Sequence, residues 1–209
     1  LWDEGIEGQG IKVAVLDTGI DADHPEFQGI YKGGKNFVPH TGTDYTRPRA
    51  DDDASETSPV ERPSHRPEFN ANGNSFYTSH GTHVAGTIAA IGANEYGVKG
   101  IAPKVDLYMY RVLGAYGSGS TSGIIKGIET AVIEEMDIIN LSLGGGANSE
   151  TDGSSFAINN AMMAGTIAVS ATGNSGPNRG TIGTPATSRL GIAVGNTTNP
   201  ETMHNGEVS

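Results

Sequence analysis

Short apolar runs of strand length alternate with segments of helical periodicity along most of the chain, and this alternation constrains the fold more than any other feature. A strand followed by a helix and a second strand forms a βαβ unit, and successive units build a parallel sheet. We therefore predict an α/β fold, with a parallel sheet and helices on both of its faces. The strand patterns lie at residues 11–16, 105–113, 137–143, 166–171 and 191–195, and the helical patterns at 80–90, 120–136 and 154–164.

One segment, at about residues 41–75, interrupts this alternation. It contains several prolines and the acidic run Asp51–Asp53, and it has almost no apolar residues. We expect it to be an exposed acidic and proline-rich excursion, not a separate domain. The whole length of 209 residues then fits one domain, or most of one.

The charge of the chain excludes several classes of partner. Asp and Glu number 24 against 13 Lys and Arg, which gives a formal net charge of −11. We therefore expect no nucleic acid and no anionic membrane as a partner, whereas cationic ligands, including metal ions, suit this charge.

No apolar stretch approaches the roughly 18 residues of a membrane-spanning helix, so we also expect no membrane span. The chain has no cysteine, which excludes disulfides and thiolate zinc sites.

A motif with two histidines opens the first helical pattern. Residues 79–87 read Ser-His-Gly-Thr-His-Val-Ala-Gly-Thr, so that His80 lies in the first turn and His83 follows three residues later. Two hydrogen-bonded core histidines are one interpretation. A zinc site is a weaker one, because the metalloprotease helix places its histidines four residues apart around a glutamate.

Two further motifs follow predicted strands, at the strand ends where ligands bind in open α/β sheets. Asp17-Thr18-Gly19 ends the first strand, and it indicates either a turn aspartate or an aspartic-protease motif, although that second class is all-β and needs two such aspartates. The run 172–176, with Asn174 at its centre, follows another strand. It is either an ordinary turn or a source of an amide donor for an oxyanion.

Taken together and in this order, the three motifs resemble those of the subtilisin family of serine proteases. The resemblance extends over nearly all of the chain, and its details are similar to the minor extracellular protease group of bacilli, which carries an inserted protease-associated domain. It implies a subtilisin-like fold and an Asp, His, Ser order of catalytic groups. By this resemblance Asp17 would orient His80, His80 would act as the general base, Asn174 would stabilise the oxyanion, and His83 would be structural.

The same resemblance implies how an extended peptide or protein substrate binds. Such a substrate would be added as a strand between two edges, Ser118-Gly119-Ser120 and Ser142-Leu143-Gly144. The side chain before the cleaved bond would enter a pocket suited to large apolar or aromatic groups. We expect its walls to be formed by Gly144, Gly145, Thr172 and Gly173, with Gly183 near its base.

No serine in the chain has the surroundings of the family nucleophile. Ser188 is the nearest candidate, but its neighbours match a structural stretch of the family. We therefore interpret residues 1–209 as an N-terminal portion of a secreted subtilisin-like endopeptidase, inactive alone and completed by the rest of the catalytic domain. An inactive peptide-binding module is the alternative, and a nucleotide-binding domain is a distant third, because neither phosphate-binding fingerprint is present.

Calcium is the cofactor that the resemblance implies, in a structural role. Glu26 aligns with a carboxylate ligand, and the loop 91–98 resembles an oxygen cage made by Asn94 and the carbonyls of Ile91, Tyr96 and Val98. Two departures from the family pattern oppose this prediction. The loop is one residue longer, and residues 1–4 offer no counterpart of the N-terminal ligand.

Overall fold

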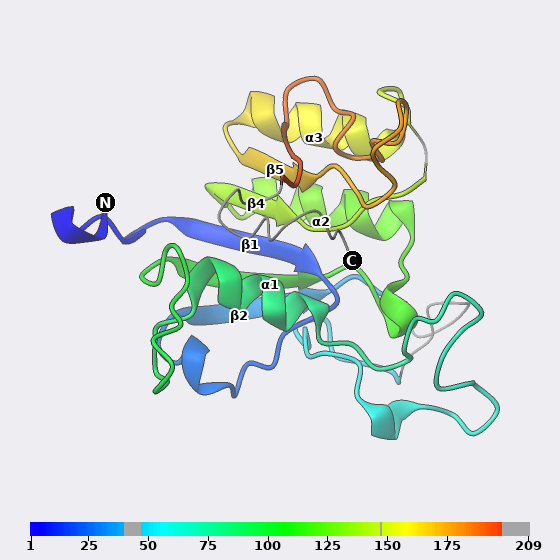
Figure 1. Ribbon diagram of the computed structural model, residues 1–209, viewed down its shortest axis with the longest axis horizontal. Coiled ribbons are helices and arrows are strands. Elements are labelled where there is room, and N and C mark those ends of the chain that lie inside the picture. The colour runs from blue at the N-terminus through cyan, green and yellow to red at the C-terminus, as the bar shows by residue number, and fades with distance from the viewer. Residues whose placement is uncertain (40–46, 147, 198–209) are drawn as a thin grey trace, which may run out of the picture.

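The computed structural model describes residues 1–39, 47–146 and 148–197, and its centre is one parallel sheet (Figure 1). The six strands lie in the order β2-β3-β1-β4-β5-β6, and every neighbouring pair is parallel. The strands are β1 Lys12–Asp17, β2 Tyr31–Asn36, β3 Asp106–Arg111, β4 Ile138–Leu141, β5 Ile167–Ala171 and β6 Ile192–Val194. The helices are α1 His80–Ala89, α2 Thr121–Ile133 and α3 Gly153–Ala164, with short 3₁₀ turns at Trp2–Glu4, Pro25–Phe27, Pro59–Glu61 and Ala115–Gly117.

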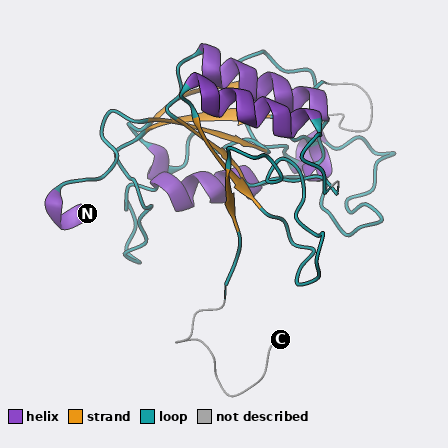
Figure 2. Ribbon diagram, turned by 90° about the horizontal axis from the view of Figure 1, so that it is seen from above, coloured by secondary structure: helices purple, strands orange, loops and turns teal. Residues whose placement is uncertain are grey.

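Helices cover both faces of the sheet, as the sequence predicts. Figure 2 shows α2 and α3 side by side on one face and α1 on the other. Each face has its own core, because the side chains of β1 alternate between them: Ala14 and Leu16 pack toward α2 and α3, whereas Val13 and Val15 pack toward α1. The predicted α/β fold is confirmed.

The strand β2 has no counterpart among the predicted elements. Its sequence is Tyr-Lys-Gly-Gly-Lys-Asn, which lacks the apolar run that marks a buried strand. It pairs along β3 at the edge of the sheet, with a register shift between Tyr31 and Gly33. Because main-chain pairing at an edge needs few apolar side chains, periodicity gives no signal for such a strand.

The excursion is exposed over much of its described part, residues 47–75, but it is anchored at several points; residues 41–46 of the prediction lie outside the described residues. The Arg49 side chain is completely buried, and Ala54 and Thr57 are buried as well. Arg49 donates to Ser55 O (2.7 Å), to Glu56 O (3.1 Å) and to the Glu61 carboxylate (3.0 Å). A charged side chain folds the excursion onto itself, which the composition does not indicate.

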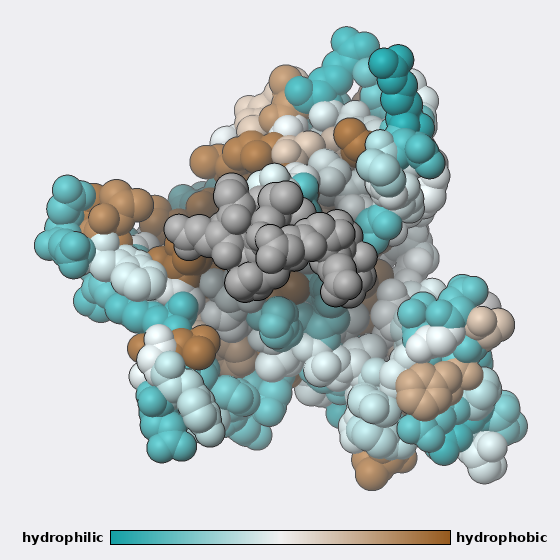
Figure 3. Space-filling view, viewed as in Figure 1, coloured by the Kyte–Doolittle hydropathy of each residue, from teal (hydrophilic) through white to brown (hydrophobic). Residues whose placement is uncertain are grey.

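Exposed apolar side chains gather where β5 and β6 reach the surface, at the end of the sheet opposite β2 (Figure 3). Ile192 and Val194 of β6 are 49% and 51% exposed, and Ile167 of β5 is 44% exposed. Among the residues that the structure describes, no helix has the length and apolar character needed to cross a membrane.

Candidate active site

Asp17 and His80 meet where the end of β1 approaches the start of α1. Asp17 is the last residue of β1 and is completely buried, whereas His80 is the first residue of α1. The His80 Nδ1 lies 2.8 Å from Asp17 Oδ1 and 3.0 Å from Oδ2. The structure thus brings together two groups that are 63 residues apart in the sequence. Because Asp17 occupies Nδ1, the Nε2 atom remains to exchange a proton with another group.

The small and hydroxylated residues of both motifs allow this close approach. Thr18 N donates to Asp17 Oδ1 (2.7 Å), and Gly81 N donates to Thr18 Oγ1 (2.8 Å), so that the strand end and the helix start are joined directly. A Cβ atom added to Gly81 would lie only 2.2 Å from Gly19 O. Glycine is therefore required at position 81 for α1 to lie this close to β1.

The environment of His80 favours its protonated form. The hydrogen bond that His80 donates to Asp17 raises the pKa of His80 above its ordinary value, partial burial opposes this, and the negative charges of Asp17 and Glu56 add to the rise. The imidazole is 56% exposed, so its free edge faces solvent. His83 is also exposed. The interpretation of the two histidines as buried core residues is therefore wrong.

A cleft with a volume of about 1080 Å³ opens beside His80 and collects residues from segments that lie far apart in the sequence. Most of the predicted substrate-binding residues line it together with Asn174, and they come from the ends of the strands, as expected for an α/β sheet. The predicted residues along this cleft are Ser118, Gly119, Ser142, Leu143, Gly144, Gly145 and Asn174.

The remaining predicted substrate-binding residues do not line the cleft. Gly183 N donates to Thr172 O (3.2 Å), and a Cβ atom on Gly183 would lie 2.3 Å from Gly145 O, so Gly183 packs against the back of the pocket wall. Gly173 does not line the cleft, although its neighbour Asn174 does. Ser120 caps the N-terminus of α2, where its hydroxyl accepts from Gly123 N (3.1 Å).

The end of the excursion and the residues directly after it contribute a wall of the cleft that the sequence does not predict. Asn74, Ser75 and Tyr77 line the cleft beside His80. Tyr116, which also lines it, holds this wall in place, because its hydroxyl donates to Pro67 O (2.6 Å) and its ring packs edge-on against buried Phe76. The only signal in the sequence is that the excursion directly precedes the histidine motif.

Among the described residues, no serine hydroxyl is hydrogen-bonded to His80. Within residues 1–39, 47–146 and 148–197, the hydrogen bonds of the His80 ring go to Asp17, and none goes to a serine hydroxyl. Ser188 is not among the residues that line the cleft.

The predicted calcium ligands Glu26, Asn94 and Val98 converge on one loop. Glu26 Oε2 accepts from Gly92 N (2.7 Å), and Oε1 accepts from the Asn94 amide, which also donates to Val98 O (2.7 Å). These hydrogen bonds lower the pKa of Glu26, with the Asn94 bond contributing most. The Asn94 nitrogen thus lies between the Glu26 carboxylate and the Val98 carbonyl.

The other two predicted ligands enter the loop as donors. Tyr96 N donates to Asn94 Oδ1 (3.0 Å), and Ile91 N donates to Glu26 O (3.1 Å). One carboxylate, one amide and main-chain carbonyls are ligands of the kind that calcium prefers, so the residues fit the ion in their chemistry. To bind calcium, the Asn94 amide would have to turn so that its oxygen, not its nitrogen, faces Glu26. Among the described residues, no group of three acidic or histidine side chains is arranged to hold a metal ion.

Comparison with known proteins identifies the family. A model of the Subtilase family matches residues 8–208. The minor extracellular protease Vpr of Bacillus subtilis (strain 168) is 44% identical over 199 residues, which cover 95% of this chain and 22% of that protein. Subtilisin E of the same organism is 40% identical over 197 residues, which cover 93% of this chain and 43% of that protein.

The fold gives the same result. The solved structure of sphericase matches with a TM-score of 0.66 and 33% sequence identity, over 90% of this chain and 53% of that one. This chain therefore spans between about a fifth and a half of the length of these three proteins. From the family match, the relatives and the Asp17–His80 geometry, we conclude that the chain belongs to the subtilase family.

Proposed function

We propose that residues 1–209 form the acid and histidine part of a serine endopeptidase. The observation that carries this proposal is the pairing of buried Asp17 with His80 at the wall of a cleft. In the reaction His80 Nε2 would take the proton from a serine hydroxyl as its oxygen attacks the peptide carbonyl, and would then give that proton to the leaving amine. The serine would come from a further segment of the complete protease, as in the order Asp, His, Ser.

Asn174 would stabilise the oxyanion that forms during this attack. It is exposed and lines the same cleft as His80, which supports a role toward bound substrate. Replacing Asn174 by Ala should lower kcat by about 10² to 10³, a magnitude that was established for such a donor in a subtilisin. KM should change little, because the charge on the oxygen is present only in the transition state. Steady-state kinetics of the complete protease would measure both values.

The substrate would be an extended peptide. Ser118 and Gly119 line one side of the cleft and Ser142 to Gly145 another, so that both can form main-chain hydrogen bonds with an added strand. The glycine walls leave room for a large apolar or aromatic side chain before the cleaved bond. Cleavage of a peptide library mainly after acidic or very small residues would contradict this preference.

Labelling with a fluorophosphonate probe tests the proposal directly. We expect no label on residues 1–209 alone and strong labelling of the complete protease, which should be lost in the His80→Ala variant. Peptide binding by a complete protease that takes no label would instead support an inactive binding module.

Calcium would stabilise the Glu26 loop in the same protease. Glu26 is 92% buried by residue area, since only 8% is exposed, and it joins the loop 91–98 to the body of the domain. Chelation should lower the Tm, and the Glu26→Gln variant should show a smaller shift. An unchanged Tm after chelation would rule calcium out.

The remaining parts of the protease would cover the exposed apolar edge at β6. Half-exposed Ile192 and Val194 support a further strand or loop packed there. A protease-associated domain and secretion are proposed from the likeness to the minor extracellular protease. Intact mass and the location of the native protein, in cells or in the culture medium, would test both.

A further inference from the structure

The helix α1, which begins with His80, has no N-terminal cap of its own. The N-cap residue Ser79 makes no side-chain hydrogen bond to the helix. The first turn of any helix carries N–H groups without intrahelical acceptors, and buried or partly buried groups of this kind need partners. Any movement of this turn moves the imidazole of His80, so the partners of these groups determine where the histidine lies.

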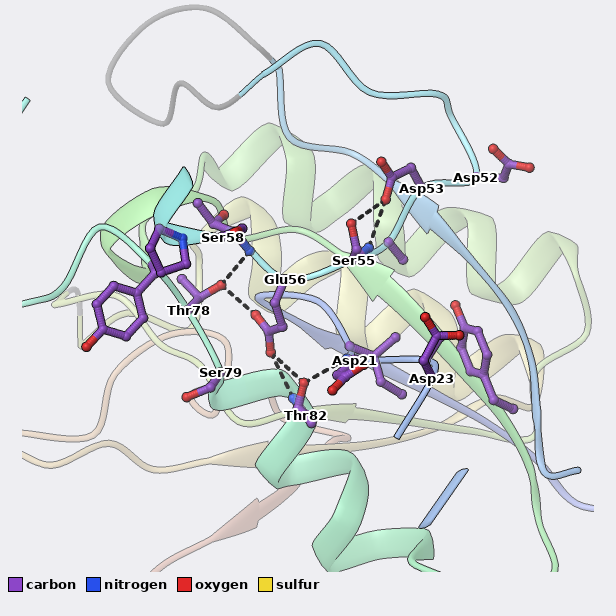
Figure 4. A pocket seen from close by; sticks show the side chains of 17 residues that line it. Asp21, Asp23, Asp52, Asp53, Ser55, Glu56, Ser58, Thr78, Ser79 and Thr82 are labelled. Atoms are coloured by element: carbon purple, nitrogen blue, oxygen red, sulfur yellow. Dashed lines mark hydrogen bonds between the residues drawn. The ribbon is translucent and has the colours of Figure 1, made fainter. Parts of the chain in front are cut away.

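Two side chains from other segments cap the helix instead. Thr18, at the end of β1, accepts from Gly81 N (2.8 Å). Glu56, in the excursion, accepts from Thr82 N (2.9 Å) and from the Thr82 hydroxyl (3.0 Å) through Oε1, and from the Thr78 hydroxyl through Oε2 (Figure 4). One carboxylate thus holds the residues on both sides of the Ser79–His80 pair.

Glu56 is itself held by the anchored part of the excursion. The buried guanidinium of Arg49 donates to Glu56 O (3.1 Å) and binds Glu61. Thr57 N donates to Thr78 Oγ1 (3.0 Å), so that the segment bearing Glu56 runs beside the chain that enters α1. The carboxylate therefore reaches the helix from a fixed main chain.

We propose that Glu56 is a positioning residue for His80, which it holds at the cleft by capping α1 from the excursion. This inference rests on the proposed protease function. A carboxylate at a helix N-terminus is also favoured by the helix dipole, so a charged group suits this place better than a neutral one. The usual N-cap side chains, such as Asn and Ser, cap a helix from the residue directly before it. Glu56 instead reaches α1 from a segment distant in the sequence.

The charges around His80 predict a measurable consequence. Asp17 from β1 contributes most to the raised pKa of His80 and Glu56 contributes a smaller part, whereas burial acts against both. Asp21 lies beside Thr82, to which its N–H donates, and His83 follows on the same helix. Removing the charge of Glu56 should lower the pKa of His80, so the neutral base form should persist to lower pH.

The test uses three variants of the complete protease: Glu56→Gln, Glu56→Ala and the control Asp23→Asn. Asp23 lines the same cavity of about 740 Å³ as Glu56, but within the described residues its carboxylate makes no hydrogen bond to α1. Glu56→Gln keeps an acceptor oxygen and loses the charge. We expect it to lower the pKa of His80, because the negative charge of Glu56 is one of the causes of the raised value.

Glu56→Ala removes both the charge and the acceptor. It should lower kcat about tenfold with little change in KM, because a small displacement of a catalytic group is costly while the peptide-binding edges remain. The His80 pKa is read by NMR titration of the imidazole and from the acid limb of kcat/KM. An equal pKa in Glu56→Gln and Asp23→Asn would overturn the proposal, as would wild-type kcat in Glu56→Ala.

The two readouts separate this inference from the proposed function. Should the protein prove not to be a protease, the fluorophosphonate label would be missing, while the NMR titration would still show whether Glu56 acts on His80. Should Glu56→Ala fail to fold, Glu56→Gln decides the question through the pKa alone.

Discussion

Two neighbouring regions of the molecule can be compared: the contact between Asp17 and His80, and the anchored segment 47–61 of the excursion. Each shields a charged side chain from water, Asp17 in the first and Arg49 in the second. At the contact between Asp17 and His80, adjacent residues in the sequence position the two groups, because Thr18 follows Asp17 and Gly81 follows His80. At the second, Arg49 is enclosed by carboxylates and carbonyls from its own segment. Local motifs therefore predict the contact between Asp17 and His80, whereas the neighbouring segment is held by the buried guanidinium of Arg49, which no motif indicates.

A second buried arginine joins this segment to the sheet. Arg111, at the end of β3, is completely buried and lies in register with Asp17. It donates to Asn36 Oδ1 (2.8 Å) and to Thr57 Oγ1 (2.9 Å), and burial lowers its pKa to about 10. The strand β3, which pairs with β1, and the excursion are thus linked through a charged side chain, so a substitution in the excursion should affect the contact between Asp17 and His80.

The largest effect is expected at the catalytic pair itself. In the complete protease Asp17→Asn should lower kcat by about 10⁴, because the amide holds the imidazole in the wrong tautomer. The loss of stability, measured as the fall in Tm, should be small beside the loss of activity. Active-site titration together with a thermal melt measures both, and a loss of activity that only follows the loss of folded protein would remove the distinction between the two regions.

Breaking the anchor of the excursion should instead affect stability first. Arg49→Met removes the completely buried ion-pair partner of Asp53 and Glu61 and should cost about 3 to 5 kcal/mol of unfolding free energy. Arg47→Met is the matched control, since Arg47 binds the same Asp53 but is 48% exposed, and should cost about 1 kcal/mol or less. Denaturant titration of both variants would show whether burial is the decisive difference.

The close approach of α1 to β1 can be tested with one methyl group. Gly81→Ala should destabilise the protein by about 1 to 3 kcal/mol, because the new Cβ would overlap Gly19 O. In the same helix Gly86 has nothing within 4 Å of an added Cβ, and Gly86→Ala should stabilise by up to about 1 kcal/mol. Equal effects of the two substitutions would show that the helix can shift away from the strand.

The smallest effect distinguishes α2, which is capped by its own N-cap residue, from α1, which is capped by residues distant in the sequence. Ser120→Ala removes the hydroxyl that caps α2 and should cost about 1 kcal/mol. Ser79→Ala should change stability by only a few tenths of that, since the Ser79 side chain makes no capping bond to α1. Matching losses in thermal melts would contradict the capping by Thr18 and Glu56.

The sequence predicts the elements that carry periodicity and the residues that carry short motifs. The strands around Leu16 and Leu141 and the helix after Ser120 follow directly from their apolar spacing. The strand β2 and the burial of Arg49 are not predicted in this way. Glycines and charged side chains take these positions because of their pairing partners, and the positions of those partners are set only in the complete fold. The role proposed for Glu56 has no local signal for the same reason.

The position of Asp17 in the sheet also has a dynamic consequence. It ends β1, which pairs with β3 along its whole length and with β4 over Val13–Val15, so the strand is hydrogen-bonded on both sides. The backbone amides leading to Asp17 should therefore exchange with solvent only when a large part of the sheet opens, whereas those of β6, with a neighbour on one side, should exchange earlier. Asp17 then keeps its place while the β6 edge of the sheet opens locally.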